Sequence, residues 1–450
     1  MPCSAFRQRI KSQEVKNIIL AGPQTGSGAM SFVVTEHIAA ISPYSKFQTQ
    51  PTRPPGLDVK GAVYLFRHGI IHVNGHDFHT GIVPFLDKLK RLKKSGKEYT
   101  RGELAFLQDY SCRVQERDIG RISEQGIRQC HRMGKTLSKR YADTLLAGNS
   151  LRGLDIWTDS AARCQESAQA FGQGFEEAWS TLASCSSPQS RVQKIDAGEG
   201  TRSCENLCWH KQFEEIDQNA GQTAADEFKS QYTVPIIDRL AEYAIGDFKL
   251  TPHDIYAMQL ICCYDLVLED KSPFSKLFTS EDWLGFEYTR DIKYYHSEGY
   301  GMPRPGVYAL PWLERTIELL QELLAGRSGE NLPLWTGFTH REEVLYLVIA
   351  LGLYHDGSRP PSTTHMDIER KWNVGKIAPY LGHVGLEVCL TKDHQRRLRI
   401  IVNGEVVLAF KGKIYADSNW TYALDDVQRY LQQSGVQLGR EEIGKLTFLK

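Results

Sequence analysis

The sequence predicts an α/β protein, a three-layer α/β/α sandwich with a mainly α-helical cap domain inserted into it. Three apolar, strand-like runs, at residues 62–66, 154–157 and 333–338, each end in polar or charged residues. The second and third runs lead into helical patterns, and residues 176–326 between them are mainly helical in pattern. Because open α/β sheets bind ligands beyond the carboxyl ends of their strands, we expect the residues after the three runs to form one site.

The first run, Ala62–Phe66, is apolar, aromatic and β-branched, as in a buried strand, and it ends in Arg67, His68 and Gly69. A neutral imidazole can attack a phosphoryl group, and a guanidinium matches phosphate oxygens. A glycine lets backbone amides approach an anion closely. His68 is therefore a candidate nucleophile and Arg67 a candidate phosphate ligand, although the tripeptide alone also fits a strand end with an incidental histidine.

The other two runs add further candidates. The run at 154–157 is followed by a polar turn that places Arg163 in the first turn of a helix, where the helix dipole and unpaired amides favour an anion. The run at 333–338 leads into His340 and Glu342 at the start of an apolar helix. Three strand ends thus offer cations or imidazoles, and one also offers a carboxylate.

Further elements follow in chain order. Helical patterns cover residues 84–94 and 123–146, and Ser123 is a capping signal for the second. Thr251 followed by Pro252 predicts another helix start inside the cap. Strand-like runs at 398–402 and 405–409, joined through Asn403-Gly404, predict a hairpin, and a helix follows at 425–433.

These elements give four predicted segments. They are residues 1–56 as an N-terminal extension and linker, 57–175 with 327–412 as the α/β catalytic domain, 176–326 as the helical cap, and 413–450 as a peripheral C-terminal segment.

Several motifs occur in a characteristic succession. In chain order they are Arg67-His68-Gly69, Ser160-x-x-Arg163, Ser-Pro-Phe-x-x-Leu-Phe at residues 272–278, and Thr339-His340 ahead of Ala-Leu-Gly-Leu-Tyr at residues 350–354. From about Ala39 to about Lys411 the chain resembles the histidine acid phosphatases, the phytase-like branch of the histidine phosphatase superfamily. The resemblance implies a fold like that of the histidine phosphatases and phosphoglycerate mutases. It also implies two-step hydrolysis of phosphomonoesters through phosphohistidine, without a cofactor.

The same resemblance implies roles. His68 would be the nucleophile, and Arg67, Arg163 and His340 would hold the phosphoryl group. Glu342 follows His340 as in the His-Ala-Glu sequence of the inositol polyphosphate phosphatases, and it would be the general acid, which needs a raised pKa to keep its proton. Alternatively, Glu342 only complements the helix dipole. The implied substrate is a phosphorylated small molecule, such as an inositol phosphate or a small metabolite phosphate.

The first motif departs from the family pattern Arg-His-Gly-x-Arg-x-Pro, since Ile71 replaces the second arginine and Val73 the proline. Losing one donor from a phosphate clamp costs about 2–4 kcal/mol of transition-state stabilisation. His72 or Arg341 could supply the missing cation, although strand alternation directs His72 away from the side of Ile71 and Arg341 could instead face solvent. The departure leaves open a phosphatase-like scaffold repurposed for another reaction or for ligand binding, for example in specialised metabolism.

A metal site and a nucleotide site have weaker support in the sequence. A set of residues with ligand-like spacing consists of His68, His72, His76, Asp77 and His79. The apolar residues and the Asn-Gly turn among them argue against a helix that would align them. Cys204 and Cys208 with His210 make at most half a zinc site, and the glycine-rich segment 22–28 lacks the Gly-Lys-Ser/Thr ending of a P-loop.

Composition indicates a cytoplasmic enzyme without a nucleic-acid or membrane partner. The 450 residues include 54 Lys plus Arg and 54 Asp plus Glu, so no net charge favours nucleic acid or an anionic membrane. No apolar stretch has the length of a signal-peptide core or a membrane span. The ten cysteines are scattered, and Ser275 stands where secreted phytases place a bridged cysteine, so we expect reduced thiols. The sequence makes no prediction of the oligomeric state.

Overall fold

The computed structural model describes residues 32–47, 56–147, 153–183, 191–194, 219–303, 306–327, 332–357, 359–410 and 413–437. Its strands are β1 (Leu57–Arg67), β2 (Asp155–Thr158), β3 (Arg191–Lys194), β4 (Leu334–Thr339), β5 (His383–Thr391), β6 (Arg396–Val402), β7 (Glu405–Val406) and β8 (Tyr422–Ala423). Its α-helices are α2 (Val83–Lys94), α3 (Glu124–Tyr141), α4 (Ala162–Ala183), α5 (Gln222–Tyr232), α6 (Val234–Leu240), α7 (Pro252–Glu269), α8 (Ser280–Ser297), α9 (Leu310–Leu324), α10 (Arg341–Ala350), α11 (Val374–Ile377) and α12 (Leu424–Gln437).

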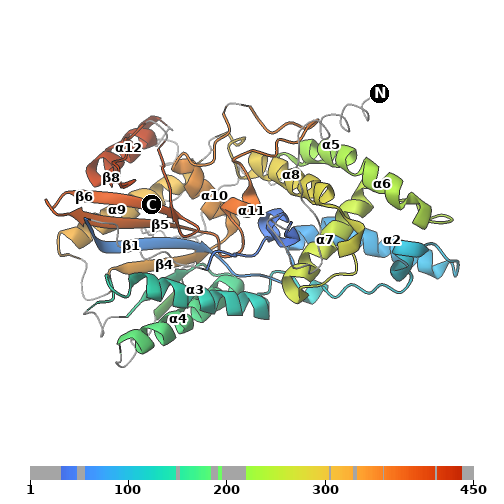
Figure 1. The fold of residues 1–450 in the computed structure, drawn as a ribbon, viewed down its shortest axis with the longest axis horizontal. Coiled ribbons are helices and arrows are strands. Elements are labelled where there is room, and N and C mark those ends of the chain that lie inside the picture. Colours follow the sequence, from blue (N-terminus) through green and yellow to red (C-terminus); the bar gives the residue numbers. More distant parts are fainter. Residues whose placement is uncertain are drawn as a thin grey trace, which may run out of the picture.

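One mixed sheet runs through the molecule in the order β3-β2-β4-β1-β5-β6-β7, and β8 pairs with β6 (Figure 1). Strands β1 to β4 are mutually parallel, whereas β5 pairs antiparallel with β1 and β6 antiparallel with β5. The three predicted strand runs correspond to β1, β2 and β4, and these strands are neighbours in the sheet in the order β2-β4-β1. Their carboxyl ends therefore meet at one edge.

Helices cover both faces of the sheet, which confirms the predicted α/β/α sandwich. Alternation along β1 assigns the faces, because successive side chains of a strand point to opposite sides. Val63 and Leu65 share a core with residues of α9, α10 and α12, and Tyr64 and Phe66 share another with residues of α3 and α4. Figure 1 shows these two sets of helices above and below the sheet.

A third core lies beyond the edge of the sheet, among α2 and α5 to α8 (Figure 1). Phe85 of α2, Phe228 of α5 and Trp283 of α8 are fully or almost fully buried there. Helix α9, inside the predicted cap range of 176–326, instead contacts β1 and α12, whereas α2, outside that range, contacts α7. Helix α12 packs on α9 and β6. The predicted domain bounds remain a prediction.

Local sequence signals explain several of these elements. The side chains of Ser123 and Thr251 accept the amide hydrogen bonds that open α3 and α7, as predicted. Asn403 and Gly404 have φ angles of 50° and 84°, the left-handed values that a tight hairpin turn between β6 and β7 requires. Strands β3, β5 and β8 were not predicted, and residues 22–28, Cys204, Cys208 and His210 lie outside the described residues.

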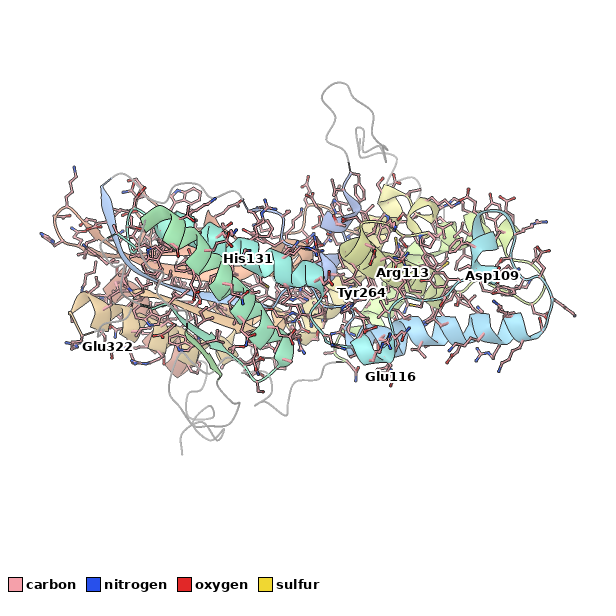
Figure 2. All side chains as sticks on the ribbon, turned by 90° about the horizontal axis from the view of Figure 1, so that it is seen from below. Asp109, Arg113, Glu116, His131, Tyr264 and Glu322 are labelled. Carbon is pink, nitrogen blue, oxygen red and sulfur yellow. The ribbon has the colours of Figure 1, made fainter. Side chains whose placement is uncertain are left out.

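Helices α3 and α4 lie against each other below the sheet, and two glycines allow their close contact. Figure 2 shows the pair from below, with His131 labelled. A Cβ atom on Gly174 would lie 1.9 Å from the carbonyl oxygen of His131, and one on Gly134 would lie 2.0 Å from that of Phe171. Backbone therefore packs on backbone, and neither site has room for a methyl group.

We expect Gly174→Ala to lower the free energy of unfolding by about 1–3 kcal/mol, because the two helices must separate to admit the methyl group. Urea unfolding followed by circular dichroism measures this change. The control is Gln173→Ala, since Gln173 is the exposed neighbour on α4 and its change should stay within about 0.5 kcal/mol. Equal midpoints for the two variants would contradict the close-contact argument.

Candidate active site

The carboxyl ends of β1, β2 and β4 bring the predicted site residues into one pocket of about 200 Å³. Arg67 pairs in register with Thr339, so His68 and His340 are the next residues on adjacent strand ends. The pocket is lined by all five predicted site residues, Arg67, His68, Arg163, His340 and Glu342. The structure thus places together residues that are up to 275 positions apart in the chain, from 67 to 342.

The ring of His68 is buried and its centroid lies 5.6 Å from that of His340. Its Nδ1 lies 2.8 Å from the carbonyl oxygen of Gly69, which can only accept a hydrogen bond, so Nδ1 carries the hydrogen. This leaves a lone pair on Nε2. Burial, followed by the charges of Arg163, Arg67 and His340, holds the pKa of His68 well below its ordinary value of 6.5. The imidazole is therefore a neutral nucleophile even in mild acid.

Arg67 is held by neutral groups. Its guanidinium donates to the carbonyl oxygens of Ala40, at 2.5 Å, and Ala378, at 2.8 Å, and it stacks 4.2 Å from the centre of the Tyr380 ring. Carbonyl dipoles position the guanidinium without cancelling its charge, which stays available for an anion. Ala40 lies in the segment predicted to be an extension and linker, so that segment contributes directly to the pocket.

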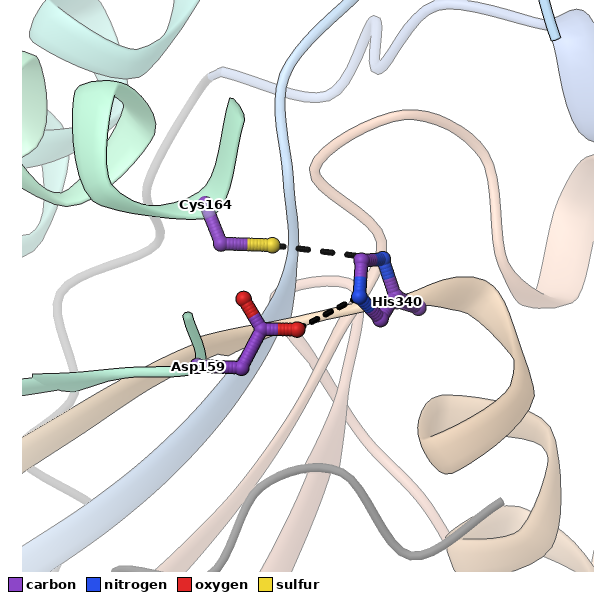
Figure 3. Close-up of side chains that lie close together, drawn as sticks. All are labelled: Asp159, Cys164 and His340. Atoms are coloured by element: carbon purple, nitrogen blue, oxygen red, sulfur yellow. Dashed lines mark hydrogen bonds and ion pairs between the residues drawn. The ribbon is translucent and has the colours of Figure 1, made fainter. Parts of the chain in front are cut away.

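Arg163 and His340 form one connected group with Asp159 and Cys164, shown in Figure 3 apart from Arg163. Arg163, in the first turn of α4 as predicted, donates to Nδ1 of His340 at 3.0 Å. Nε2 of His340 lies 2.5 Å from Oδ2 of Asp159, and the Sγ of Cys164 lies 3.9 Å from Nδ1. Since Nδ1 accepts, Nε2 carries the hydrogen and faces the Asp159 carboxylate in this close contact. The sequence analysis missed Asp159, although it directly follows β2.

The metal hypothesis built on His68, His72, His76, His79 and Asp77 is not supported. Within the described part of the chain, the one set of potential ligands that comes within 4.8 Å of one another is Asp159, Cys164 and His340. The 2.5 Å separation of Asp159 and His340 is a hydrogen-bond distance, too short for an ion between them. Of the three, only His340 lines the pocket, and Asp159 and Cys164 contact its ring.

The predicted role of Gly69, close backbone approach to the anion, is wrong. The amide of Gly69 donates to the hydroxyl of Ser167 at 3.0 Å, so it is already used within the protein. A Cβ atom at this position would lie 2.7 Å from the Sγ of Cys130 and 3.0 Å from the carbonyl oxygen of Gly126. The glycine is needed because the end of β1 packs directly against the start of α3.

Ile71, which replaces the second arginine of the family pattern, lines the pocket with a buried apolar side chain. His72 is partly exposed and does not line the pocket, so it is no substitute. Arg341 does line it, and the prediction that this side chain could face solvent is wrong. A fourth arginine, Arg290 of α8, was not predicted and also lines the pocket.

Both additional arginines have acidic partners. Arg290 makes two hydrogen bonds to Asp77, at 3.0 and 3.1 Å, and Tyr264 donates to the same carboxylate at 2.7 Å. Burial raises the pKa of Asp77, but the Arg290 charge and these hydrogen bonds outweigh it, so that the pKa is lowered. Arg341 binds both oxygens of Glu298 at 2.7 Å. These cations are thus partly neutralised before any substrate binds.

Glu342 lies in the first turn of α10, with about a quarter of its side chain exposed. Its Oε1 accepts a hydrogen bond of 2.9 Å from Arg341. The position, at the mouth of the pocket and beside His340, is suitable for proton transfer to a leaving group; the role itself remains a prediction.

Comparison with known proteins defines the class. A model of the histidine phosphatase superfamily (branch 2) matches residues 59–403, and the chain belongs to this family. It is 23% identical over 418 residues to the thiamine-repressible acid phosphatase pho4 of Schizosaccharomyces pombe, covering 90% of this chain and 88% of the relative. It is 27% identical over 334 residues to a phytase A of Aspergillus terreus, covering 68% of this chain and 69% of the relative.

Solved structures agree on the fold. The crystal structure of the phytase from D. castellii has a TM-score of 0.73 at 19% identity and covers 92% of this chain and 88% of its own. The multiple inositol polyphosphate phosphatase of Bifidobacterium longum, in complex with inositol hexasulfate, has a TM-score of 0.66 at 14% identity, with coverages of 88% and 97%. The predicted family and fold are confirmed, and the chain is a phosphoric monoester hydrolase of the histidine acid phosphatase type.

The lowered pKa of His68 gives a prediction for pH dependence. Because the neutral imidazole is the reactive form, kcat/KM should fall in acid only well below pH 6.5. Arg163→Gln removes a charge that lowers this pKa, so its acid limb should move upward toward pH 6.5. Rates with p-nitrophenyl phosphate between pH 3 and 8 measure the acid limb of the wild type and that of the variant. Ionisation of the substrate affects the two proteins equally and cancels when their profiles are compared. Superimposable limbs would contradict the electrostatic argument.

Proposed function

We propose that this protein hydrolyses a phosphorylated small molecule in two steps, through a phosphohistidine at His68. The observation that carries the proposal is a neutral, buried imidazole whose Nε2 is free, in one pocket with Arg67, Arg163 and His340. Phosphoryl transfer needs a positioned nucleophile and fixed positive charge around the equatorial oxygens, and this pocket offers both.

In the first step Nε2 of His68 attacks phosphorus. The new P–N bond forms as the bond from phosphorus to the leaving oxygen breaks, and Glu342 gives its proton to that oxygen. In the second step Glu342 takes a proton from water, which attacks phosphorus and breaks the P–N bond. Inorganic phosphate leaves, and the imidazole and the protonated Glu342 are restored.

The cap helix α8 and helix α10 compensate for the arginine that Ile71 replaces. Arg290 and Arg341 line the same pocket as Arg67 and Arg163, so the positive charge near the phosphoryl group comes from four arginines. No observation favours a scaffold repurposed for a different reaction. Inositol phosphates and small metabolite phosphates are both compatible with the names of the relatives, which include acid phosphatases and phytases.

We further propose that the protein works in the cytoplasm, as the sequence analysis expected. The support comes from the six described cysteines, all free thiols: Cys112, Cys130, Cys164, Cys262, Cys263 and Cys389. Ser275, at the position of a bridged cysteine in secreted phytases, lies with its hydroxyl 3.6 Å from the Sγ of Cys262. The helices described here include none with the length and apolarity of a membrane span.

His68→Ala tests the nucleophile. We expect phosphate release from p-nitrophenyl phosphate to fall by about 10⁴-fold or more, because the covalent route is lost. Brief reaction with a ³²P-labelled ester followed by denaturation should leave an acid-labile, base-stable label on the wild-type chain and none on the variant. Circular dichroism checks that the variant is folded. Equal release by both proteins would eliminate the phosphohistidine mechanism.

Glu342→Gln tests the general acid. The rate should fall about 100-fold for an alkyl phosphate, whose leaving oxygen needs a proton, and by less than about tenfold for p-nitrophenyl phosphate. Single-turnover phosphorylation isolates the first step from the hydrolysis of the intermediate. If both esters lose the same factor in that step, Glu342 is not the acid.

A further inference from the structure

The carboxylate of Asp159, the residue after β2, lies behind the pocket of His68 and contacts the ring of His340 (Figure 3). Asp159 does not line the pocket, and its side chain is 1% exposed. Its Oδ1 accepts a hydrogen bond of 2.9 Å from the amide of Ala161, in a turn that leads into α4. Its Oδ2 lies 2.5 Å from Nε2 of His340. The first contact prepares the start of the helix, whereas the second acts on the pocket.

The ring of His340 separates this carboxylate from a guanidinium. Nε2 faces Asp159, and Nδ1 accepts a hydrogen bond of 3.0 Å from Arg163. An imidazole that accepts at Nδ1 and carries its one hydrogen on Nε2 is neutral. The negative charge and the positive charge therefore lie on opposite sides of one neutral ring. Before an anion binds, the guanidinium compensates the buried carboxylate across the ring.

An anion in the pocket changes what this arrangement requires. Phosphoryl oxygens accept hydrogen bonds, so Nδ1 of His340 can bond to one only if it carries a hydrogen. Arg163 has a donor to offer such an anion, since its buried Nε has no hydrogen-bond partner among the described residues. Once the anion engages this guanidinium, the carboxylate of Asp159 faces a neutral ring. A second hydrogen on the ring then restores a positive charge beside the carboxylate.

Other ionisable groups also surround this ring. The thiol of Cys164 lies 3.9 Å from Nδ1 and is only a weak donor or acceptor. The ring of His68 lies 5.6 Å away between centroids, and burial, followed by the charge of Arg163, lowers its pKa. The remaining pocket charges oppose one another: Arg67 and Arg163 disfavour a positive ring, Glu342 favours one, and the pairs Arg290–Asp77 and Arg341–Glu298 are each neutral.

We propose that Asp159 is a positioning residue that makes binding of the phosphoryl group take up one proton, at Nδ1 of His340. The inference deepens the proposed function, because it takes the anion beside His68 to be the reacting phosphoryl group. The proton comes from solvent and forms the new N–H bond, which donates to a phosphoryl oxygen. The donors of Arg163 pass from Nδ1 to the anion, and Oδ2 of Asp159 stabilises the positive ring at Nε2. Release of phosphate returns the proton to solvent.

Sulfate is the probe for this proton, because it resembles a phosphate dianion in shape and charge and does not titrate near neutral pH. Calorimetry near pH 7, in two cationic buffers of different ionisation enthalpy, gives the number of protons taken up per sulfate bound. We expect about one in the wild type, so the dissociation constant should rise by up to about tenfold per pH unit.

Asp159→Asn and Asp159→Ser remove the charge but keep an oxygen that can accept the hydrogen bond from Ala161. Both variants should take up less than about 0.3 proton per sulfate. They should also bind sulfate about tenfold more weakly, because the charge-assisted hydrogen bond from the ring is lost. Asp155→Asn is the matched control, since it makes the same change at the first residue of β2, and its proton uptake should equal that of the wild type.

Two measurements show where the proton goes. His68→Ala should leave the uptake unchanged. Nitrogen NMR of the histidine-labelled wild type, assigned with His340→Gln, should show Nδ1 of His340 change from an acceptor to a protonated nitrogen when sulfate is added. Thermal melting checks each fold. The proposal is overturned if the folded Asp159 variants keep the uptake, if Asp155→Asn loses it equally, if His68→Ala abolishes it, or if Nδ1 does not change.

Kinetics separate this inference from the proposed function. In Asp159→Asn the alkaline limb of kcat/KM for p-nitrophenyl phosphate should move to lower pH by about one unit, because the carboxylate no longer favours the positive ring. If the wild type hydrolyses no ester, the proposed function fails, yet proton uptake that depends on Asp159 still supports the inference. If turnover is present and the uptake is the same with and without Asp159, the inference fails and the phosphohistidine mechanism stands.

Discussion

The pocket depends on keeping several positive charges buried when no anion is bound. The four arginines are held in three ways: Arg67 by carbonyl oxygens, Arg163 by the ring of His340, and Arg290 and Arg341 by carboxylates. Unpaired charges in a poorly hydrated site are costly, so the fold surrounds them with oriented dipoles and carboxylates. Burial, and then the same positive charges, hold the pKa of His68 well below its ordinary value. In the proposed mechanism, the arginines that would bind the phosphoryl group therefore also help to keep His68 neutral.

Because Ile71 replaces an arginine of the family pattern, part of the positive charge around the pocket comes from elements outside β1. Arg67 and Arg163 come from the sheet domain, whereas Arg290 comes from a helix of the cap core and is already paired with Asp77. The predicted site residues thus lie at the strand ends, and the cap contributes one further charged side chain to the pocket.

Prediction from sequence succeeded where the signal is local. The strands β1, β2 and β4 have continuous apolar runs, and His68, Arg163 and His340 follow them directly. Strand β5 was missed because it contains Gly385 and Glu387, which strands disfavour. A Cβ on Gly385 would lie 2.3 Å from the Tyr64 ring, and the charge of Glu387 is met by arginines from α3 and β6. Such partners come only from tertiary contacts, and so does the arrival of Arg290 at the site.

The segment before β1 has a consequence for handling the protein. The carbonyl of Ala40 orients Arg67, and that of Ser42 accepts a hydrogen bond from the amide of Tyr380, on which Arg67 stacks. Trimming the chain to the sheet at residue 57, by cloning or by a protease, would leave His68 in place but release the guanidinium of Arg67 from the Ala40 carbonyl. Loss of turnover after such cleavage would then mean that Arg67 is no longer held in position, although the side chains of His68 and Arg67 are both still present.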